Sequence, residues 1–130
     1  LFKFFGRREG GYYSRCKPCH RIQLHATGIV RKYNITPDRY AAIKAAQGGK
    51  CAICRVATGA SKALAVDHDH SCCPAGGSCG ECVRGVLCSP CNKMLGFGRD
   101  RPEFFERAAE YLRNPPAARL NIRAIHEENR

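Results

Sequence analysis

The spacing of apolar residues predicts two helices in the N-terminal part of the chain. From residue 18 to about residue 33, apolar side chains recur every three or four positions, although Gly28 weakens the pattern. The next helix has clearer limits, because Thr36 can act as its N-cap, Pro37 can occupy its first turn and Gly48-Gly49 can end it.

Two short apolar segments in the middle of the chain are predicted to form antiparallel strands. The first, residues 63–66, ends at Asp67, and its expected partner is residues 83–87. Ser89 can cap a short helix that follows immediately, with Pro90 in its first turn. This order predicts a small α+β fold, in which a ββα unit is flanked by helices.

A further amphipathic helix is predicted near the C-terminus. Asp100 and Glu103 have the spacing of a capping box, and apolar positions continue with helical period to about Arg113. The run Asn114-Pro115-Pro116 should end this helix. Residues 117–130 could form one more helix.

Composition and charge narrow the classes of function. A chain of 130 residues is expected to be one domain, and a domain of this size benefits from metal staples because its core is limited. The net charge of +11 and the pI near 9.4 are typical of proteins that bind nucleic acid. No apolar run approaches the ~20 residues of a membrane span and no signal peptide is evident, so we expect no membrane partner and a reducing, cytoplasmic setting.

Four of the ten cysteines form two C-x-x-C pairs, Cys51/Cys54 and Cys88/Cys91. Ten cysteines suit either a disulfide scaffold or thiolate metal sites, and the repeated C-x-x-C spacing favours metal. Two such pairs can bind one tetrahedral Zn²⁺ and leave no open position, which is the pattern of a structural zinc. Closing this site would present the segment between the pairs as a clamped hairpin.

The clamped segment carries the residues with the most informative chemistry. Asp67-His68-Asp69-His70 follows the first predicted strand, and Asn92 directly follows the second cysteine pair. Zinc binding would bring the end of that strand and the start of the next helix into one unit. Carboxylate and amide oxygens suit Mg²⁺, and histidine titrates near neutral pH. The pattern therefore predicts a zinc-stapled, Mg²⁺-dependent hydrolase of phosphodiesters.

These motifs, in this order, resemble the ββα-metal nucleases (His-Me finger or HNH type), and specifically the recombination endonuclease VII family. The resemblance covers about residues 36–113. The matching segments are Cys51-Ala52-Ile53-Cys54, residues 66–70, residues 84–92, and the helix that contains Phe104 and Tyr111-Leu112.

The resemblance implies a role for each residue of the predicted site. Asp67 and Asn92 would bind one Mg²⁺ or Mn²⁺, and His68 would be the general base that takes a proton from the attacking water. Hydrolysis would leave 5′-phosphate and 3′-hydroxyl ends. His70 could contact the scissile phosphate or a neighbouring group, whereas Asp69 should point away and stabilise the loop.

Two features depart from the family pattern. Some members have an acidic metal-site residue three positions after the asparagine, where this chain has Leu95, so the cation would have fewer protein ligands. The connection between the two strands is also enlarged and contains cysteines with the spacing C-C-x5-C-x2-C. They could bind a second Zn²⁺, or Cys72 or Cys73 could form a disulfide with Cys79 or Cys82.

The N-terminal pair Cys16/Cys19 has no evident partner pair. It resembles the second half of a zinc knuckle, and it could also be two free thiols in a turn. Its remaining ligands would be His20, His25, the cysteines at 72–82, or a half-site before Leu1. The candidate ligands of a second zinc are therefore Cys16, Cys19, Cys72, Cys73, Cys79 and Cys82.

The expected partner is DNA, with RNA as an alternative. Arg84, Lys93 and Arg99, together with Arg101, are candidate phosphate contacts, which set affinity rather than sequence preference. The rival interpretation is a non-catalytic, zinc-stapled nucleic-acid-binding module. The sequence after Leu112 predicts no extensive helical homodimer.

We therefore expect nicking or cutting of duplex or branched DNA by a monomer or by a subunit of a larger nucleic-acid-processing complex. The expected location is the cytoplasm of a bacterial or phage-infected host cell. Three parts are expected along the chain. Residues 1–34 form a partial zinc knuckle and helix, residues 35–113 form the nuclease domain, and residues 114–130 form a tail or helix.

Overall fold

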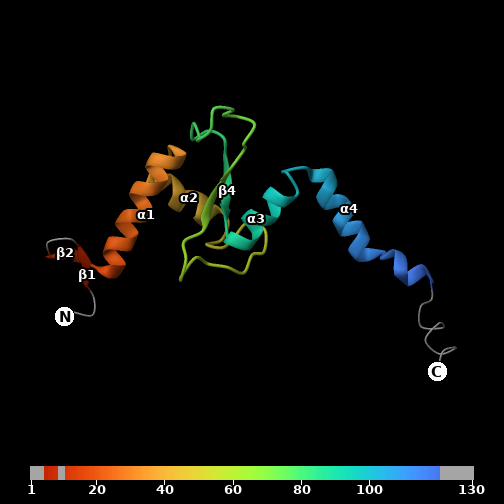
Figure 1. Cartoon of the computed structure of the whole chain (residues 1–130), viewed down its shortest axis with the longest axis horizontal. Helices are drawn as coiled ribbons and strands as arrows, with labels where there is room; N and C mark the ends of the chain where they lie inside the picture. The colour runs from red at the N-terminus through yellow and green to blue at the C-terminus, as the bar shows by residue number, and fades with distance from the viewer. Residues whose placement is uncertain (1–4, 9–10, 121–130) are drawn as a thin grey trace, which may run out of the picture. The chain divides into compact units, whose positions relative to one another are not determined.

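The computed structural model of the chain describes the backbone at residues 5–8 and 11–120, and the side chains from Cys16 to Leu120. In these residues, four α-helices and two small sheets make up a mixed α+β fold, which confirms the predicted class (Figure 1). The chain divides into two compact units, residues 1–92 and residues 93–130. The predicted domain limits at residues 34 and 113 stay a prediction. Within the described part of the chain, no helix is both long and apolar enough to cross a membrane.

The chain begins with a short hairpin that the sequence pattern did not predict. Strand β1 (Phe5–Arg8) pairs antiparallel with β2 (Gly11–Cys16), and the register shifts between Phe5 and Arg7. Cys16 ends β2 and also caps the following helix, because its sulfur accepts a hydrogen bond from the backbone N–H of Cys19 at 3.4 Å. The N-terminal cysteine pair is therefore part of a strand-to-helix junction.

Two helices confirm the predictions made from apolar spacing and capping residues. Helix α1 (Lys17–Tyr33) ends at Asn34, which has a left-handed backbone conformation with φ of 55°. Helix α2 (Pro37–Ala46) begins as predicted, since the Thr36 hydroxyl oxygen accepts a hydrogen bond from the Arg39 N–H at 3.1 Å. The positive φ angles of Gly48 and Gly49 carry the chain away from the helix.

The central sheet consists of β3 (Ala65–His68) and β4 (Val83–Leu87), paired antiparallel as predicted. Strand β3 begins two residues later than predicted and includes Asp67 and His68. Asp67 pairs with Gly85, but His68 pairs with Val83, so the register shifts at this point. An extra residue on one strand breaks the alternation of side chains and can turn them to the same side.

The side chain of Gln47 joins the end of α2 to the middle of β4. Its carbonyl oxygen accepts from the Val86 N–H at 2.9 Å, and its amide nitrogen donates to the Val86 carbonyl at 2.8 Å. The same nitrogen donates to the Lys50 carbonyl at 2.9 Å. A Cβ at Gly85 would lie 2.8 Å from the Gln47 oxygen, so glycine allows this close approach. The Gln47 side chain therefore makes the pair of hydrogen bonds that a neighbouring strand would make to β4.

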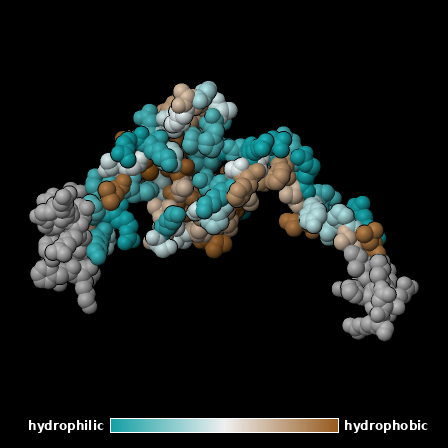
Figure 2. All heavy atoms as spheres, viewed as in Figure 1, coloured by the Kyte–Doolittle hydropathy of each residue, from teal (hydrophilic) through white to brown (hydrophobic). Residues whose placement is uncertain are grey.

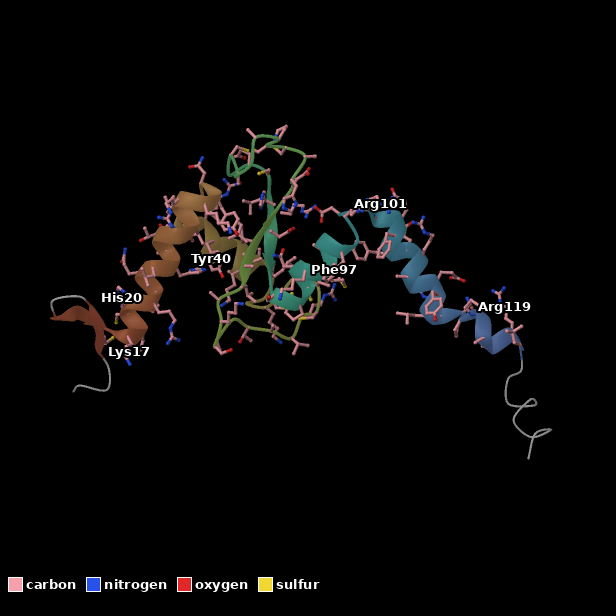
Figure 3. All side chains as sticks on the ribbon, in the orientation of Figure 1. Lys17, His20, Tyr40, Phe97, Arg101 and Arg119 are labelled. Atoms are coloured by element: carbon pink, nitrogen blue, oxygen red, sulfur yellow. The ribbon has the colours of Figure 1, made fainter. Side chains whose placement is uncertain are left out.

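The core is small and lies around the central sheet. Leu64 and Val86 are almost completely buried, and Cys51 joins them there. Tyr40 on α2, labelled in Figure 3, donates its hydroxyl hydrogen bond to the Leu64 carbonyl at 2.8 Å. The remaining core side chains are Ile29, Ile35, Val66, Cys82 and Leu87. This limited core agrees with the expectation that metal staples supplement it.

Helix α3 (Ser89–Phe97) follows β4 after a single residue and completes the ββα order (Figure 1). Helix α4 (Pro102–Arg113) ends where predicted, but the predicted Asp100–Glu103 capping box is wrong. The N-cap is Arg101 without a side-chain cap, and Asp100 has φ of 53° in the turn before it. Pro116–Leu120 form the 3₁₀ helix η2, and residues 121–130, where a further helix was predicted, lie outside the described residues.

Candidate active site and cysteine clusters

Cys51, Cys54, Cys88 and Cys91 form a group whose four sulfur atoms all lie within 4.8 Å of one another. Tetrahedral zinc has Zn–S bonds of about 2.3 Å, so neighbouring sulfurs in such a site are about 3.8 Å apart. The sulfurs of Cys54 and Cys88 are 3.9 Å apart. The donor set and its spacing therefore fit Zn²⁺, as the two C-x-x-C pairs predicted.

Backbone hydrogen bonds hold this group against the central sheet. The Cys51 N–H donates to the Ala57 carbonyl at 2.8 Å, and the Arg55 N–H donates to the Cys51 carbonyl at 3.0 Å, which folds the first pair into a tight turn. The Ala52 N–H also donates to Val86 at 3.3 Å. The turn, the exit of β4 and the first turn of α3 therefore meet at one point.

The pKa values of two thiols in this group, Cys51 and Cys91, shift in opposite directions. Burial opposes ionisation of Cys51, but hydrogen bonds from the backbone of Cys88, Cys54 and Ile53 lower its pKa to about 6. Burial and the neighbouring sulfurs of Cys88 and Cys51 raise the pKa of Cys91 to about 12. A divalent cation supplies the charge that allows all coordinating thiols to ionise.

Asp67 on β3 is buried, and its carboxylate accepts two hydrogen bonds from Arg84. The Arg84 guanidinium donates from Nε to Oδ2 at 2.7 Å and from Nη2 to Oδ1 at 2.9 Å, while the Asp67 side chain is only 8% exposed. The register between β3 and β4 passes over Arg84, which places it on the same side as Asp67. A buried carboxylate requires a counter-charge, and Arg84 supplies it here.

His68 is half-buried between two aromatic neighbours. Its ring centroid lies 5.6 Å from that of Tyr33, which ends α1, and 4.6 Å from that of His70. Burial lowers the pKa of His68, and the positive charges of His70, Arg84 and Lys32 act in the same direction against the opposing charge of Asp67. His68 is therefore favoured in its neutral form, which can accept a proton.

The structure brings His70 to the same side as His68 although β3 ends at His68. Asp69 has the loop role that was expected, because its Oδ1 accepts from the Ser71 N–H at 2.9 Å and from the Ser71 hydroxyl at 2.7 Å. Asn92 lies in the first turn of α3, where its N–H donates to the Cys88 carbonyl at 3.0 Å. Its place directly after the Cys91 ligand puts it next to the first cysteine group.

A second group consists of Cys72, Cys73, Cys79 and Cys82, whose sulfurs also lie within 4.8 Å of one another. Burial and hydrogen bonding differ among them, and only Cys82 is buried. Hydrogen bonds from the backbone of Cys82 and Glu81 lower the pKa of Cys79 to about 7, while the neighbouring thiols of Cys79 and Cys73 raise that of Cys72 to about 12. Cys16 and Cys19 belong to neither group within the described residues.

The basic residues predicted to contact phosphate lie on different elements. Arg84 is on β4 and pairs with Asp67, whereas Lys93 is exposed on α3 and Arg99 is exposed in the turn after it. Arg101, labelled in Figure 3, precedes α4. Hydrophilic side chains also cover much of the visible part of α1 (Figure 2), which carries exposed Lys17, Arg21, Arg31 and Lys32.

Sequence reasoning missed the residues that support the site from a distance. The residues predicted for the site include neither Gln47 at the end of α2 nor Tyr33 at the end of α1. Both are polar-tipped side chains at the ends of helices, which is the one signal that could have indicated them. The Arg84–Asp67 pair had no local signal, because it depends on the register shift between the strands.

Comparison with known proteins identifies the family of this chain. The model of the recombination endonuclease VII family matches residues 26–114. The chain belongs to the recombination endonuclease VII family. This membership supports a DNA endonuclease role, and the matched residues include the first cysteine group, the second group and the Asp67–His70 segment.

Two mycobacteriophage proteins are relatives of this endonuclease VII family chain. The Gene 59 protein of Mycobacterium phage L5 is 50% identical over 119 residues, which are 91% of this chain and 68% of that protein. The Gene 59 protein of Mycobacterium phage D29 is 40% identical over 119 residues, which are 91% of this chain and 67% of that protein. No solved structure matches the chain significantly.

Proposed function

We propose that this endonuclease VII family member is a metal-dependent endonuclease that hydrolyses phosphodiester bonds in DNA. The observation that carries the proposal is the environment of His68, a half-buried ring that directly follows the buried Asp67. Burial and the neighbouring positive charges lower the pKa of His68, which favours its neutral form. A general base must be unprotonated at the working pH and must lie beside the reacting group. The net charge of +11 supports a polyanionic substrate.

The donor chemistry of the site fits a hard cation. Asp67 and Asn92 would hold Mg²⁺ or Mn²⁺ through a carboxylate and an amide oxygen. A carboxylate offers about four lone-pair positions, so the two hydrogen bonds from Arg84 leave acceptor capacity on both oxygens. When bound, such a cation supplies positive charge to a phosphate oxygen and to the leaving oxygen.

The remaining steps fall to side chains of the chain itself. His68 accepts a proton from a water molecule as the water oxygen bonds to phosphorus and the bond to the 3′ oxygen breaks, which leaves 5′-phosphate and 3′-hydroxyl ends. Tyr33 and His70 pack against the His68 ring and restrict its orientation. His70, whose ring centroid lies 4.6 Å from that of His68, would contact the same phosphate.

Lys32 adds a phosphate contact that was not predicted. Its Nζ lies 5.3 Å from the Tyr33 ring centroid, and its charge acts on His68. A phosphate at His68 would therefore lie in the positive field of both Lys32 and Arg84. Lys93 and Arg99 remain proposed contacts to more distant phosphates.

The rival function, a zinc-stapled module that binds nucleic acid without cleaving it, is favoured by one observation. The Arg84 guanidinium forms an ion pair with Asp67 through two hydrogen bonds, an arrangement that also suits a site with no metal. Direct measurement of Mn²⁺ binding by electron paramagnetic resonance separates the two proposals. Binding to the wild type that is lost in Asp67→Ala supports the nuclease, whereas equal behaviour of the two proteins supports the binding module.

The function itself is tested by incubating supercoiled plasmid with the protein in the presence and absence of Mg²⁺ or Mn²⁺. We expect metal-dependent nicking that His68→Ala abolishes. His20→Ala is the matched control, because His20 lies in the first turns of α1, outside the proposed site (Figure 3). Failure of the wild type to nick under either metal, with DNA binding retained, would overturn the proposal.

Substrate preference follows from the same charge pattern. We expect phosphate-dominated, strongly salt-dependent binding with modest sequence preference, by a monomer or a subunit of a larger phage complex in the cytoplasm of an infected cell. Linear duplex, nicked, forked and four-way-junction DNA, compared at matched salt, test the preference, and a matched RNA duplex tests the alternative polymer. A stable dimer with a strong preference for four-way junctions would contradict it.

A further inference from the structure

The connection between β3 and β4 is an ordered platform rather than an extended loop. It turns sharply at Asp69, where the Asp69 N–H donates to the Cys82 carbonyl at 2.9 Å and the Cys72 N–H donates to the Asp69 carbonyl at 3.2 Å. Within it, the Gly76 N–H donates to Cys73 at 2.9 Å. These bonds close the connection on itself directly beyond the strand that carries His68.

The four sulfurs of this connection have the spacing of a tetrahedral site. The sulfurs of Cys72 and Cys79 are 3.8 Å apart, and zinc bonded to four thiolates sets neighbouring sulfurs about 3.8 Å apart. A disulfide would require about 2.05 Å. Cys72, Cys73, Cys79 and Cys82 form no disulfide, so the group presents four potential thiolates rather than crosslinked pairs.

The same connection is docked on the corner between α1 and α2. The Asn34 side-chain amide donates to the Cys79 carbonyl at 3.1 Å, and Arg39 forms an ion pair with Glu81 at 3.2 Å. A Cβ at Gly80 would lie 2.6 Å from the Asn34 carbonyl oxygen, so the backbones are in close contact there. Gly80 also has φ of 91°, which glycine adopts without strain.

We propose that Cys72, Cys73, Cys79 and Cys82 bind a second structural Zn²⁺, which locks the β3–β4 connection onto the α1–α2 corner and thereby positions His68 and His70. The N-terminal pair Cys16/Cys19 is not part of this site. The metal site stands independently of enzymatic activity, whereas its effect on His68 rests on the proposed function. The His68 ring contacts Tyr33 at the end of α1 and also contacts His70, which belongs to the connection itself, so the position of the pair depends on the docking.

The metal site is tested by counting zinc in the full-length chain with inductively coupled plasma mass spectrometry. We expect two zinc ions per chain, one for each cysteine group. The double variant Cys72→Ser/Cys79→Ser should retain one, and the matched control Cys16→Ser/Cys19→Ser, which also removes two thiols, should retain two. One zinc in the wild type, or two in the first double variant, would overturn the proposal.

A second measurement does not depend on the folding of any variant. Cobalt titrated into the zinc-free wild-type chain should bind at two equivalents and show the intense d–d absorption of tetrahedral thiolate coordination for both. Saturation at one equivalent contradicts the second site.

The positioning role is tested in the Cys72→Ser/Cys79→Ser variant once it is shown to retain the first zinc. We expect the chemical shifts of the His68 and His70 rings to move, and kcat for nicking to fall about 10-fold to 100-fold with little change in KM, because a small displacement of a base is costly to the chemical step. Ala75→Ser, an exposed position of the same connection, is the control. Unchanged shifts and kcat would reject the role and leave only a structural zinc.

Discussion

The two cysteine groups have the same ligands but different places in the chain and in the core. The first joins residues from Cys51 to Cys91 and includes Cys51, which is completely buried. The second closes only the connection from Cys72 to Cys82, and two of its four members, Cys72 and Cys79, are exposed. The longer closure removes about 1 kcal/mol more chain entropy from the unfolded state. The comparison teaches that two similar groups of metal ligands can have different roles. The first group is expected to stabilise the fold, and the second to position the proposed active site.

The largest difference between the groups should come from single cysteine substitutions. Cys51→Ser should abolish folding, because structural zinc contributes on the order of 10 kcal/mol, comparable to the whole stability of a small domain. Cys72→Ser should leave a folded chain with a lower melting temperature. Circular dichroism melting, with zinc counted in each sample, measures both. A chain with Cys51→Ser that melts like the wild type would remove the distinction.

Substitution of His68 should lower the nicking rate without changing zinc binding at either cysteine group. His68→Ala should reduce the nicking rate by about 10²–10⁴, the usual contribution of a general base, without loss of zinc. The side chain makes ring contacts with Tyr33 and His70 but has no place among the sulfur ligands. Single-turnover nicking at saturating protein gives the rate, and a parallel zinc count is the control. A rate within twofold of the wild type would exclude His68 as the base.

One side-chain amide near each cysteine group can be removed to compare how much it stabilises the fold. Gln47→Ala should cost about 2–3 kcal/mol, since it leaves the N–H of fully buried Val86 without its partner. Asn34→Gly keeps the left-handed conformation but removes an exposed hydrogen bond to Cys79, so it should cost about 0.5–1 kcal/mol. Urea unfolding of the two zinc-loaded variants provides the comparison, and a reversed order would contradict the assigned roles.

The smallest effect is expected for the exposed ion pair that joins the second group to α2. Arg39→Ala removes the contact to Glu81, but these side chains are 41% and 83% exposed, so the loss should be below about 0.5 kcal/mol. The same urea titration measures it. A loss above about 1 kcal/mol would mean that the connection is docked more firmly by charge than by the close backbone contact at Gly80.

Local chemistry explains which elements could be predicted from the sequence. The Thr36 cap, the Pro37 first turn and the Gly48-Gly49 exit of α2 use hydrogen bonds and backbone conformations set within a few residues, and all three are confirmed. The Asp100–Glu103 capping box had the same kind of signal and is wrong. Asp100 has a positive φ there and Arg101 precedes the helix instead. A capping pattern indicates that a helix begins, but the turn before it decides at which residue.

In the candidate site, too, some features could be predicted from the sequence and others depend on tertiary structure. The spacing of the cysteines was enough to predict the first cysteine group, and the apolar segments predicted the β3–β4–α3 order. The proposed base, His68, was implied by the resemblance to the endonuclease VII family. Tertiary structure decided three further features: the separation of Cys16 and Cys19 from the second group, the packing of Tyr33 on His68, and the pairing of Arg84 with Asp67. These contacts join residues far apart in the chain, and the last depends on one extra residue in a strand. Sequence patterns record ligand types and local periods, whereas register and docking are determined only when distant segments pack together.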